Sequence, residues 1–250
     1  MTHMTSRRML LGSLVATAGG ASAALLFQEP GTAALAAAQR LSASGDAMTV
    51  ELQRQLRAAL PAFRNGSAEA CRQYAATLRV WAAYGKTRNY DGQIRSQLRR
   101  LINDRGRAAV IDMTPNHDDM AGVIRALGGT REDVERMHER PGLSRKEAVV
   151  DALLKEGFTP ALERMAAQLE VVATNMDRNG RQIRAVAQYQ GASCDEVCGM
   201  ADLLKDYMEI VCALAMFFPV AAELCIAAAG AWMGALSACA LCRIGQYFWG

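Results

Sequence analysis

Six of the seven cysteines in this 250-residue chain lie close together in its last quarter. They follow the spacing C-x3-C-x13-C-x12-C-x13-C-x2-C over 49 residues, whereas Cys71 lies alone. Closely spaced thiols can form disulfides or hold a metal ion, and this density is typical of small disulfide-rich domains outside the cytosol. The six clustered residues are Cys194, Cys198, Cys212, Cys225, Cys239 and Cys242.

The spacing has a symmetry that selects one pairing among the fifteen that six cysteines allow. Pairing them from the outside inward gives three pairs that share one midpoint, near residue 218. The sequence at this midpoint is Phe217-Phe218-Pro219, and a proline is a natural stop between two helices. The predicted disulfides are therefore Cys194–Cys242, Cys198–Cys239 and Cys212–Cys225.

Helical geometry agrees with this pairing. The second and third cysteines are 14 residues apart, as are the fourth and fifth, so each pair of positions lies on nearly one helix face. Two packed helices lie ~8–10 Å apart with Cα radii of ~2.3 Å, which leaves facing Cα atoms ~4–5.5 Å apart. Disulfides require ~4.4–6.8 Å. A zinc or iron–sulfur site on the outer four cysteines is the alternative, but it leaves the middle two unexplained, so we predict no metal.

The predicted hairpin is unusually apolar. The 33-residue stretch Ile210–Cys242 contains one charge, Glu223, and an aromatic cluster of Tyr247, Phe248 and Trp249 follows it. Each arm would be ~30–35 Å long, close to the ~30 Å hydrocarbon core of a bilayer. Three interpretations stay open: a membrane-active peptide, helices buried against the preceding bundle, and a membrane anchor.

The N-terminus predicts an export signal over residues 1–23. A twin arginine precedes an apolar stretch rich in Gly and Ala, and a small-x-small cleavage site follows. The pattern resembles a twin-arginine (Tat) signal, and a Sec signal with two arginines is the alternative. Export would place the cysteines in an oxidising compartment, which favours disulfides. The residues that carry this prediction are Ser6, Arg7, Arg8, Leu10, Leu11, Ala21 and Ala23.

The sequence pattern of residues 24–190 predicts a bundle of five to seven helices. Apolar residues recur at helical spacing between capping residues, with Pro61 as the predicted end of the first helix. Ala108–Met113 is compatible with a short strand, although no partner strand is evident. The predicted N-caps or helix starts are Asp46 or Thr49, Ser67, Asp91, Asn116, Thr130, Ser144 and Thr159.

This middle region offers little chemistry. The sequence contains no phosphate-binding glycine loop, no HExxH and no nucleophile elbow. His117-Asp118-Asp119 is typical of a solvated helix start, and Cys71 lies on an apolar helix face as a small core residue. We therefore predict no catalytic residue and no cofactor. The formal net charge of +3 is too small to indicate a nucleic-acid partner.

Charge is divided unevenly along the chain. From Cys194 onward six acidic and two basic residues give −4, so the preceding part carries +7, or +5 without the two signal arginines. Residues 24–190 are thus expected to contact the hairpin domain, residues 191–250, through opposite charge as well as apolar surface. Ala192 and Ser193, in a small flexible stretch before the first clustered cysteine, are the predicted processing site.

The twin arginine of Arg7 and Arg8, the helical middle and the apolar Cys-rich tail together resemble the halocin-type bacteriocin precursors. This resemblance implies release of the C-terminal peptide as an antimicrobial and an immunity role for the N-terminal part. The nested pairing also resembles saposin-like lipid-binding domains, which have longer spacers. Both resemblances imply that the hairpin contacts lipid.

Together these observations predict an all-α protein with an N-terminal signal, a helical bundle and a C-terminal antiparallel hairpin stapled by disulfides. The predicted function is a secreted precursor of a membrane-active, bacteriocin-like peptide that acts on a target-cell membrane, shielded by the region before it. The alternative is an exported, non-toxic α-helical protein whose hairpin is a structural or lipid-binding module. An exported enzyme would need a converged polar site, for which the sequence shows no motif.

Overall fold

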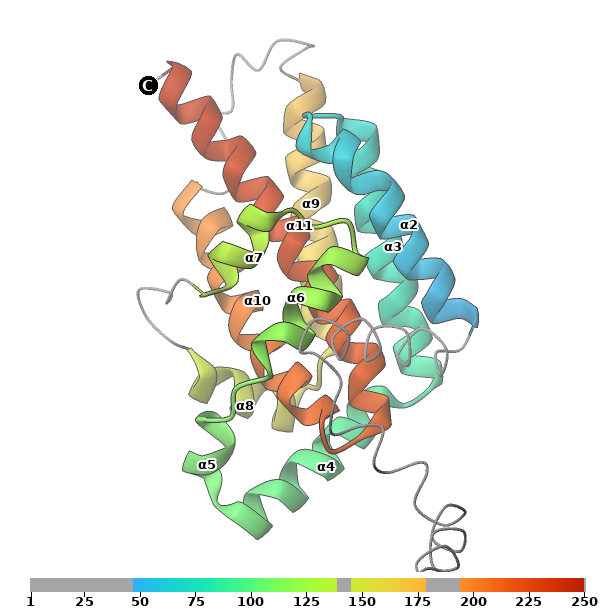
Figure 1. Ribbon diagram of the computed structural model, residues 1–250. Coiled ribbons are helices and arrows are strands. Elements are labelled where there is room, and N and C mark those ends of the chain that lie inside the picture. The colour runs from blue at the N-terminus through green and yellow to red at the C-terminus, as the bar shows by residue number, and fades with distance from the viewer. Residues whose placement is uncertain (1–46, 139–144, 179–193, 250) are drawn as a thin grey trace, which may run out of the picture.

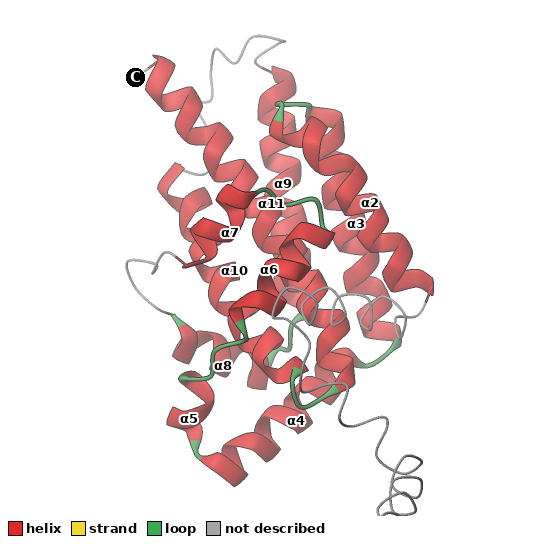
Figure 2. Cartoon of the chain, in the orientation of Figure 1, coloured by secondary structure: helices red, strands yellow, loops and turns green. Residues whose placement is uncertain are grey.

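The computed structural model describes residues 47–138, 145–178 and 194–249 (Figure 1). Over these residues the protein is all-α, as predicted, and none of them forms a strand (Figure 2). The predicted signal and processing sites lie outside the described residues, as does the predicted cap Ser144. The predicted signal and processing residues are Ser6, Arg7, Arg8, Leu10, Leu11, Ala21, Ala23, Ala192 and Ser193.

The described helices fall into two groups along the chain, eight before residue 179 and two after residue 193. The first group is α2 (Ala47–Arg64), α3 (Ala68–Thr87), α4 (Tyr90–Arg105), α5 (Arg107–Ile111), α6 (His117–Ala126), α7 (Arg131–His138), α8 (Lys146–Lys155) and α9 (Thr159–Arg178). The second is α10 (Cys194–Ala215) and α11 (Pro219–Trp249).

Several helices begin where their capping residues predict. The Ser67 side chain accepts a 3.2 Å hydrogen bond from the Ala70 amide at the start of α3. Asn116 accepts one of 3.0 Å from Asp118 at the start of α6. These side chains satisfy amides that have no partner within the helix, which stabilises each helix start by about 1 kcal/mol.

Three local predictions are wrong. Pro61 lies inside α2, where its exposed ring removes one amide close to the helix end, so the helix continues to Arg64. Residues 107–111 form the short helix α5, since a strand without a neighbour would leave its backbone groups unpaired. Asp91 lies within the first turn of α4, and Asn89 precedes that helix in a left-handed conformation.

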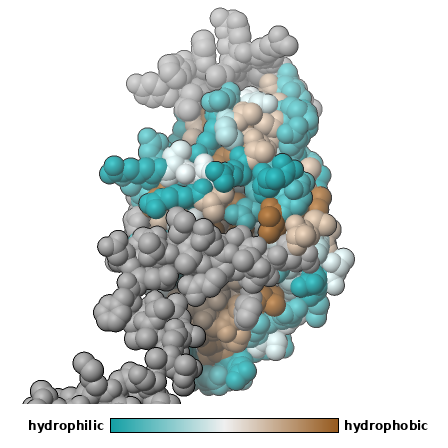
Figure 3. Space-filling view, turned by 45° about the vertical axis from the view of Figure 1, so that its right-hand side comes forward, coloured by the Kyte–Doolittle hydropathy of each residue, from teal (hydrophilic) through white to brown (hydrophobic). Residues whose placement is uncertain are grey.

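The hairpin lies inside the bundle rather than beside it. α11 packs against α10 along its length and also contacts α2, α3, α6 and α9, and in Figure 1 it runs through the centre of the molecule. One core joins both groups of helices and includes Phe63, Tyr74, Trp81, Tyr90 and Tyr207. In Figure 3, hydrophilic side chains cover most of the visible described surface, and hydrophobic ones form smaller patches between them.

Candidate functional site

The three predicted disulfides are present and join α10 to α11. Their Cα–Cα distances are 5.7 Å for Cys194–Cys242, 4.8 Å for Cys198–Cys239 and 4.6 Å for Cys212–Cys225. These values lie within the range that a disulfide between packed helices requires. The turn between the helices is residues 216–218, at the predicted midpoint. The predicted stapled antiparallel hairpin is therefore confirmed.

α11 is apolar enough to meet a membrane but is largely enclosed. Among the described helices, one segment, Val220–Arg243, has the length and composition of a membrane span. Within its most apolar 18-residue window, 78% of the residues are buried in the protein. The surrounding helices thus provide the apolar environment that this sequence needs.

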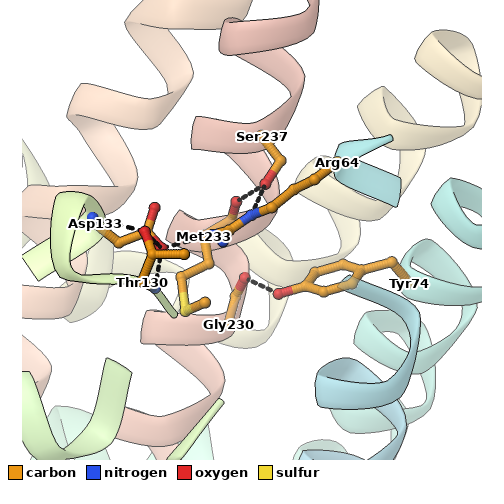
Figure 4. A network of polar contacts seen from close by, with 7 residues as sticks. All are labelled: Arg64, Tyr74, Thr130, Asp133, Gly230, Met233 and Ser237. Carbon is orange, nitrogen blue, oxygen red and sulfur yellow. Dashed lines mark hydrogen bonds and ion pairs between the residues drawn. The ribbon is translucent and has the colours of Figure 1, made fainter. Parts of the chain in front are cut away.

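Two glycines let the first group of helices approach α11 closely. A Cβ atom at Gly230 would lie 2.6 Å from Leu56 Cδ1, and one at Gly234 would lie 2.8 Å from Tyr74 Cε1. Both distances are too short for a real contact, so only glycine fits here without a shift of the neighbours. The Tyr74 hydroxyl also donates a 2.7 Å hydrogen bond to the Gly230 carbonyl oxygen (Figure 4). We call these four residues the glycine seat.

A polar network ties the second half of α11 to α2 and α7 (Figure 4). The Arg64 guanidinium forms a 2.8 Å ion pair with Asp133 and donates a 3.4 Å hydrogen bond to Ser237 Oγ. Asp133 also accepts from the Thr130 amide at 2.6 Å and from its hydroxyl at 3.0 Å. Ser237 in turn donates to the Met233 carbonyl oxygen at 2.8 Å. The network therefore connects three helices at one point of the hairpin surface.

Charged residues of α10 form an ion pair and a hydrogen bond with the start of α8. Lys146 and Glu209 form a half-buried ion pair of 2.7 Å, and the Arg145 amide donates to the Asp206 carboxylate at 2.6 Å. Burial raises the pKa of Asp206, and the nearby Glu209 carboxylate acts in the same direction; the Arg145 hydrogen bond and the Lys146 and Lys205 charges oppose it. The acidic tail and the basic middle of the chain meet at this contact.

Two further residues that the sequence analysis considered, Cys71 and His117, lie apart in the fold on α3 and α6. Cys71 is buried, and its thiol donates to the Leu169 carbonyl oxygen at 3.1 Å. Burial raises the pKa of this thiol to about 12, which disfavours the nucleophilic thiolate. His117 is exposed at the start of α6. Within the described ranges, no group of three or more His, Cys, Asp or Glu side chains is placed to hold a metal ion.

Sequence reasoning missed the glycine seat and the network around Arg64. The sequence did contain a pattern that indicates the glycine seat, because Gly230 and Gly234 are four residues apart in an otherwise apolar helix. Small residues at this spacing allow close helix packing. The partners Tyr74 and Arg64 lie more than 150 residues away, and nothing in their local sequence points to α11. The chain matches no protein-family model, no curated protein and no solved structure.

Proposed function

We propose that this chain is a secreted precursor of a membrane-active, bacteriocin-like hairpin, and that residues 47–178 shield the hairpin until it is released. The observation that carries the proposal is the burial of Val220–Arg243 by helices that precede it in the chain. A disulfide-stapled helix of this composition would bind lipid if it were free, because lipid would replace the apolar contacts that it makes in the protein.

The contacts between hairpin and shield are suited to release. Most of them are apolar, and the polar ones in the described part of the chain include the Tyr74–Gly230 and Tyr90–Glu223 bonds, the network at Arg64, the bond from Lys205 to the Arg136 carbonyl oxygen and the α8 contacts of Asp206 and Glu209. Apolar contacts are non-directional, so a bilayer can take over the role of α2, α3 and α9. The three disulfides would keep α10 and α11 together during this transfer.

The three disulfides between α10 and α11, which we call the disulfide ladder, also suggest how the hairpin would lie in a membrane. It holds α10 antiparallel to α11, so a crossing hairpin would carry Lys205, Asp206 and Glu209 into the hydrocarbon core. Each charge there costs about 2.5–3.5 kcal/mol. We therefore expect the hairpin to lie in the plane of the interface, with α11 in the lipid and the charged start of α10 in water.

The test is release of the hairpin in the intact, oxidised protein. A specific protease site replaces residues 190–193, and dye-filled vesicles are added before and after cleavage. We expect leakage only after cleavage, and growth inhibition of indicator bacteria by the cleaved protein. The control is the same chain with a scrambled protease site. Absence of both leakage and inhibition after complete cleavage would refute the proposed function.

A second function is favoured by the glycine seat. Its close packing is typical of a permanent core, which is what an exported, non-toxic α-helical protein with a structural hairpin would have. Under this alternative the cleaved hairpin stays bound to residues 47–178 in the presence of vesicles, and the two fragments co-elute on gel filtration. The same experiment therefore separates the two functions.

A further inference from the structure

The end of the molecule that carries the hairpin turn combines exposed apolar side chains with arginines. Met216 and Phe217 in the turn are 53% and 39% exposed, and they are two of the few large apolar side chains at the described surface. The Arg105 guanidinium lies over the Phe217 ring, 4.7 Å from its centre. This geometry is a cation–π contact, and it joins the turn to the end of α4.

α4 lies across this end of the hairpin. Its first residue, Tyr90, donates a hydrogen bond to Glu223 at the start of α11, and its last, Arg105, contacts Phe217. The buried side of α4 carries Ile94 and Leu98, which belong to the core. Figure 1 shows α4 and the α10–α11 turn at the same end of the molecule, opposite the C-terminal end of α11.

The outer side of α4 is basic. Three arginines and one acidic residue are the charged side chains that line an open hollow of about 410 Å³ there: Arg95, Arg99, Arg100 and Asp104, of which Arg99 and Arg100 are exposed. No described carboxylate pairs with Arg99, and Asp104 reaches Arg100 only at 3.8 Å with both side chains mostly exposed. Exposed pairs of this kind contribute little, so the positive charge of α4 stays available to a partner.

We propose that this turn-end surface, formed by Arg95, Arg99, Arg100, Arg105, Met216 and Phe217, docks the intact protein on an anionic lipid bilayer. Arginines attract the phosphate groups of anionic lipids, while exposed Met and Phe side chains enter the interface beside them. A nucleic acid would use the arginines but not the apolar turn. The inference rests on the proposed function and adds its lipid class and point of first contact.

The experiment measures binding of the full, uncleaved chain to vesicles by co-sedimentation. One set of vesicles contains equal parts of phosphatidylglycerol and phosphatidylcholine, and the other contains phosphatidylcholine only. We expect binding to the anionic set alone, weakened by added salt. Arg99→Gln with Arg100→Gln is expected to weaken it about 25-fold, and Met216→Ser with Phe217→Ser about tenfold.

The matched control is Arg57→Gln with Arg125→Gln, which removes the same charge from exposed positions on α2 and α6. It is expected to leave binding within twofold of the wild type. Thermal unfolding of each variant checks that the fold is intact. Equal losses in the control and the α4 variant, or equal binding to both vesicle sets, would overturn the proposal.

A short DNA duplex serves as the competing polyanion. If it binds through Arg99 and Arg100 at least as tightly as the anionic vesicles do, the surface is a nucleic-acid site and the lipid assignment is wrong. Leakage is not measured here. A released hairpin that fails to permeabilise vesicles therefore refutes the proposed function but not the docking surface, and the reverse outcome refutes the docking surface alone.

Discussion

The Tyr74 hydroxyl of α3 donates its hydrogen bond to the Gly230 carbonyl oxygen of α11, across 156 positions of sequence. The Tyr74 ring also fills the space that the absent side chain of Gly234 leaves. One residue of α3 thus contacts two glycines of α11, by a hydrogen bond and by close packing. The hydroxyl is fully buried, and burial raises its pKa, so it stays a neutral donor.

Removing this hydroxyl should weaken the packing of α3 on α11 without leaving a cavity in the core. Tyr74→Phe keeps the ring but loses the bond to Gly230, so we expect the free energy of unfolding to fall by about 1 kcal/mol. Urea denaturation of the oxidised protein measures it. Thr174→Ala, which removes an exposed hydroxyl bonded only to Glu170 of its own helix, should stay within about 0.5 kcal/mol. An unchanged Tyr74→Phe midpoint would show that the bond contributes nothing.

Alanine at three helical glycines should give three different results. Each replacement gains about 0.5–1 kcal/mol in helix propensity, and Gly199→Ala on α10 meets no atom within 4 Å, so it should stabilise by that amount. Gly230→Ala meets the flexible end of Leu56 and should be close to neutral. Gly234→Ala meets the held ring of Tyr74 and should destabilise by about 1–3 kcal/mol.

Urea midpoints of the three alanine variants, compared with the wild type, test this order. Each variant replaces a glycine inside a helix with alanine, so the gain in helix propensity is about the same in all three. The differences between their midpoints therefore report the packing at each position. A Gly234→Ala protein as stable as Gly199→Ala would contradict the close packing of α3 on α11.

The innermost disulfide should stabilise the fold through the unfolded chain. Cys212 and Cys225 close a separation of 13 residues, for which loop-closure entropy gives about 3 kcal/mol. Cys212→Ala with Cys225→Ala should lower the free energy of unfolding by that order, measured with the other disulfides intact. Mass mapping of unreduced peptides is the control, and links that cross between the three pairs would contradict the ladder.

The contribution of Asp206 to the free energy of unfolding should be larger at acidic pH than at neutral pH. Because its folded pKa is raised above the ordinary 3.8, the folded protein binds this proton more tightly than the unfolded chain. Its stabilising contribution is therefore full below about pH 3.8 and is lost as the pH rises through the raised folded pKa.

The pH dependence of urea midpoints for wild type and Asp206→Asn checks this sign. We expect the stability difference, wild type minus variant, to decrease as the pH rises from 3.8. Asp195→Asn removes an exposed carboxylate from the same helix and controls for net charge. A difference that increases with pH would mean that the Arg145 amide and the nearby lysines outweigh burial.

The hairpin was predictable because the residues that define it recur at regular spacing along the sequence. The cysteine spacing, the proline at its midpoint and the heptad separations all follow from local helix geometry. The caps Ser67 and Asn116 were predictable for the same reason, since a cap acts on residues two or three positions away. The all-α class follows from the same helical periodicity.

The surroundings of the hairpin were not predictable in this way. The end of the first helix was predicted too early because a helix near its end tolerates a proline such as Pro61. Residues 108–113 are a short apolar run, which periodicity alone does not assign to strand or helix, and residues 107–111 form a helix. The network of Arg64, Asp133 and Ser237 joins helices far apart in sequence, and no single segment contains its pattern. Complementary charge predicted contact between the two parts of the chain but not the central position of α11.

That central position has a consequence for synthesis. A ribosome makes α11 last among the described helices, so α2, α3, α4, α6 and α9 emerge before the helix that they all contact. The apolar side chains with which these helices pack on α11 therefore stay uncovered until α11 has been translated. A stop codon just before Pro219 would therefore leave most of the sequence but remove the helix that these five helices contact, together with one cysteine of each disulfide.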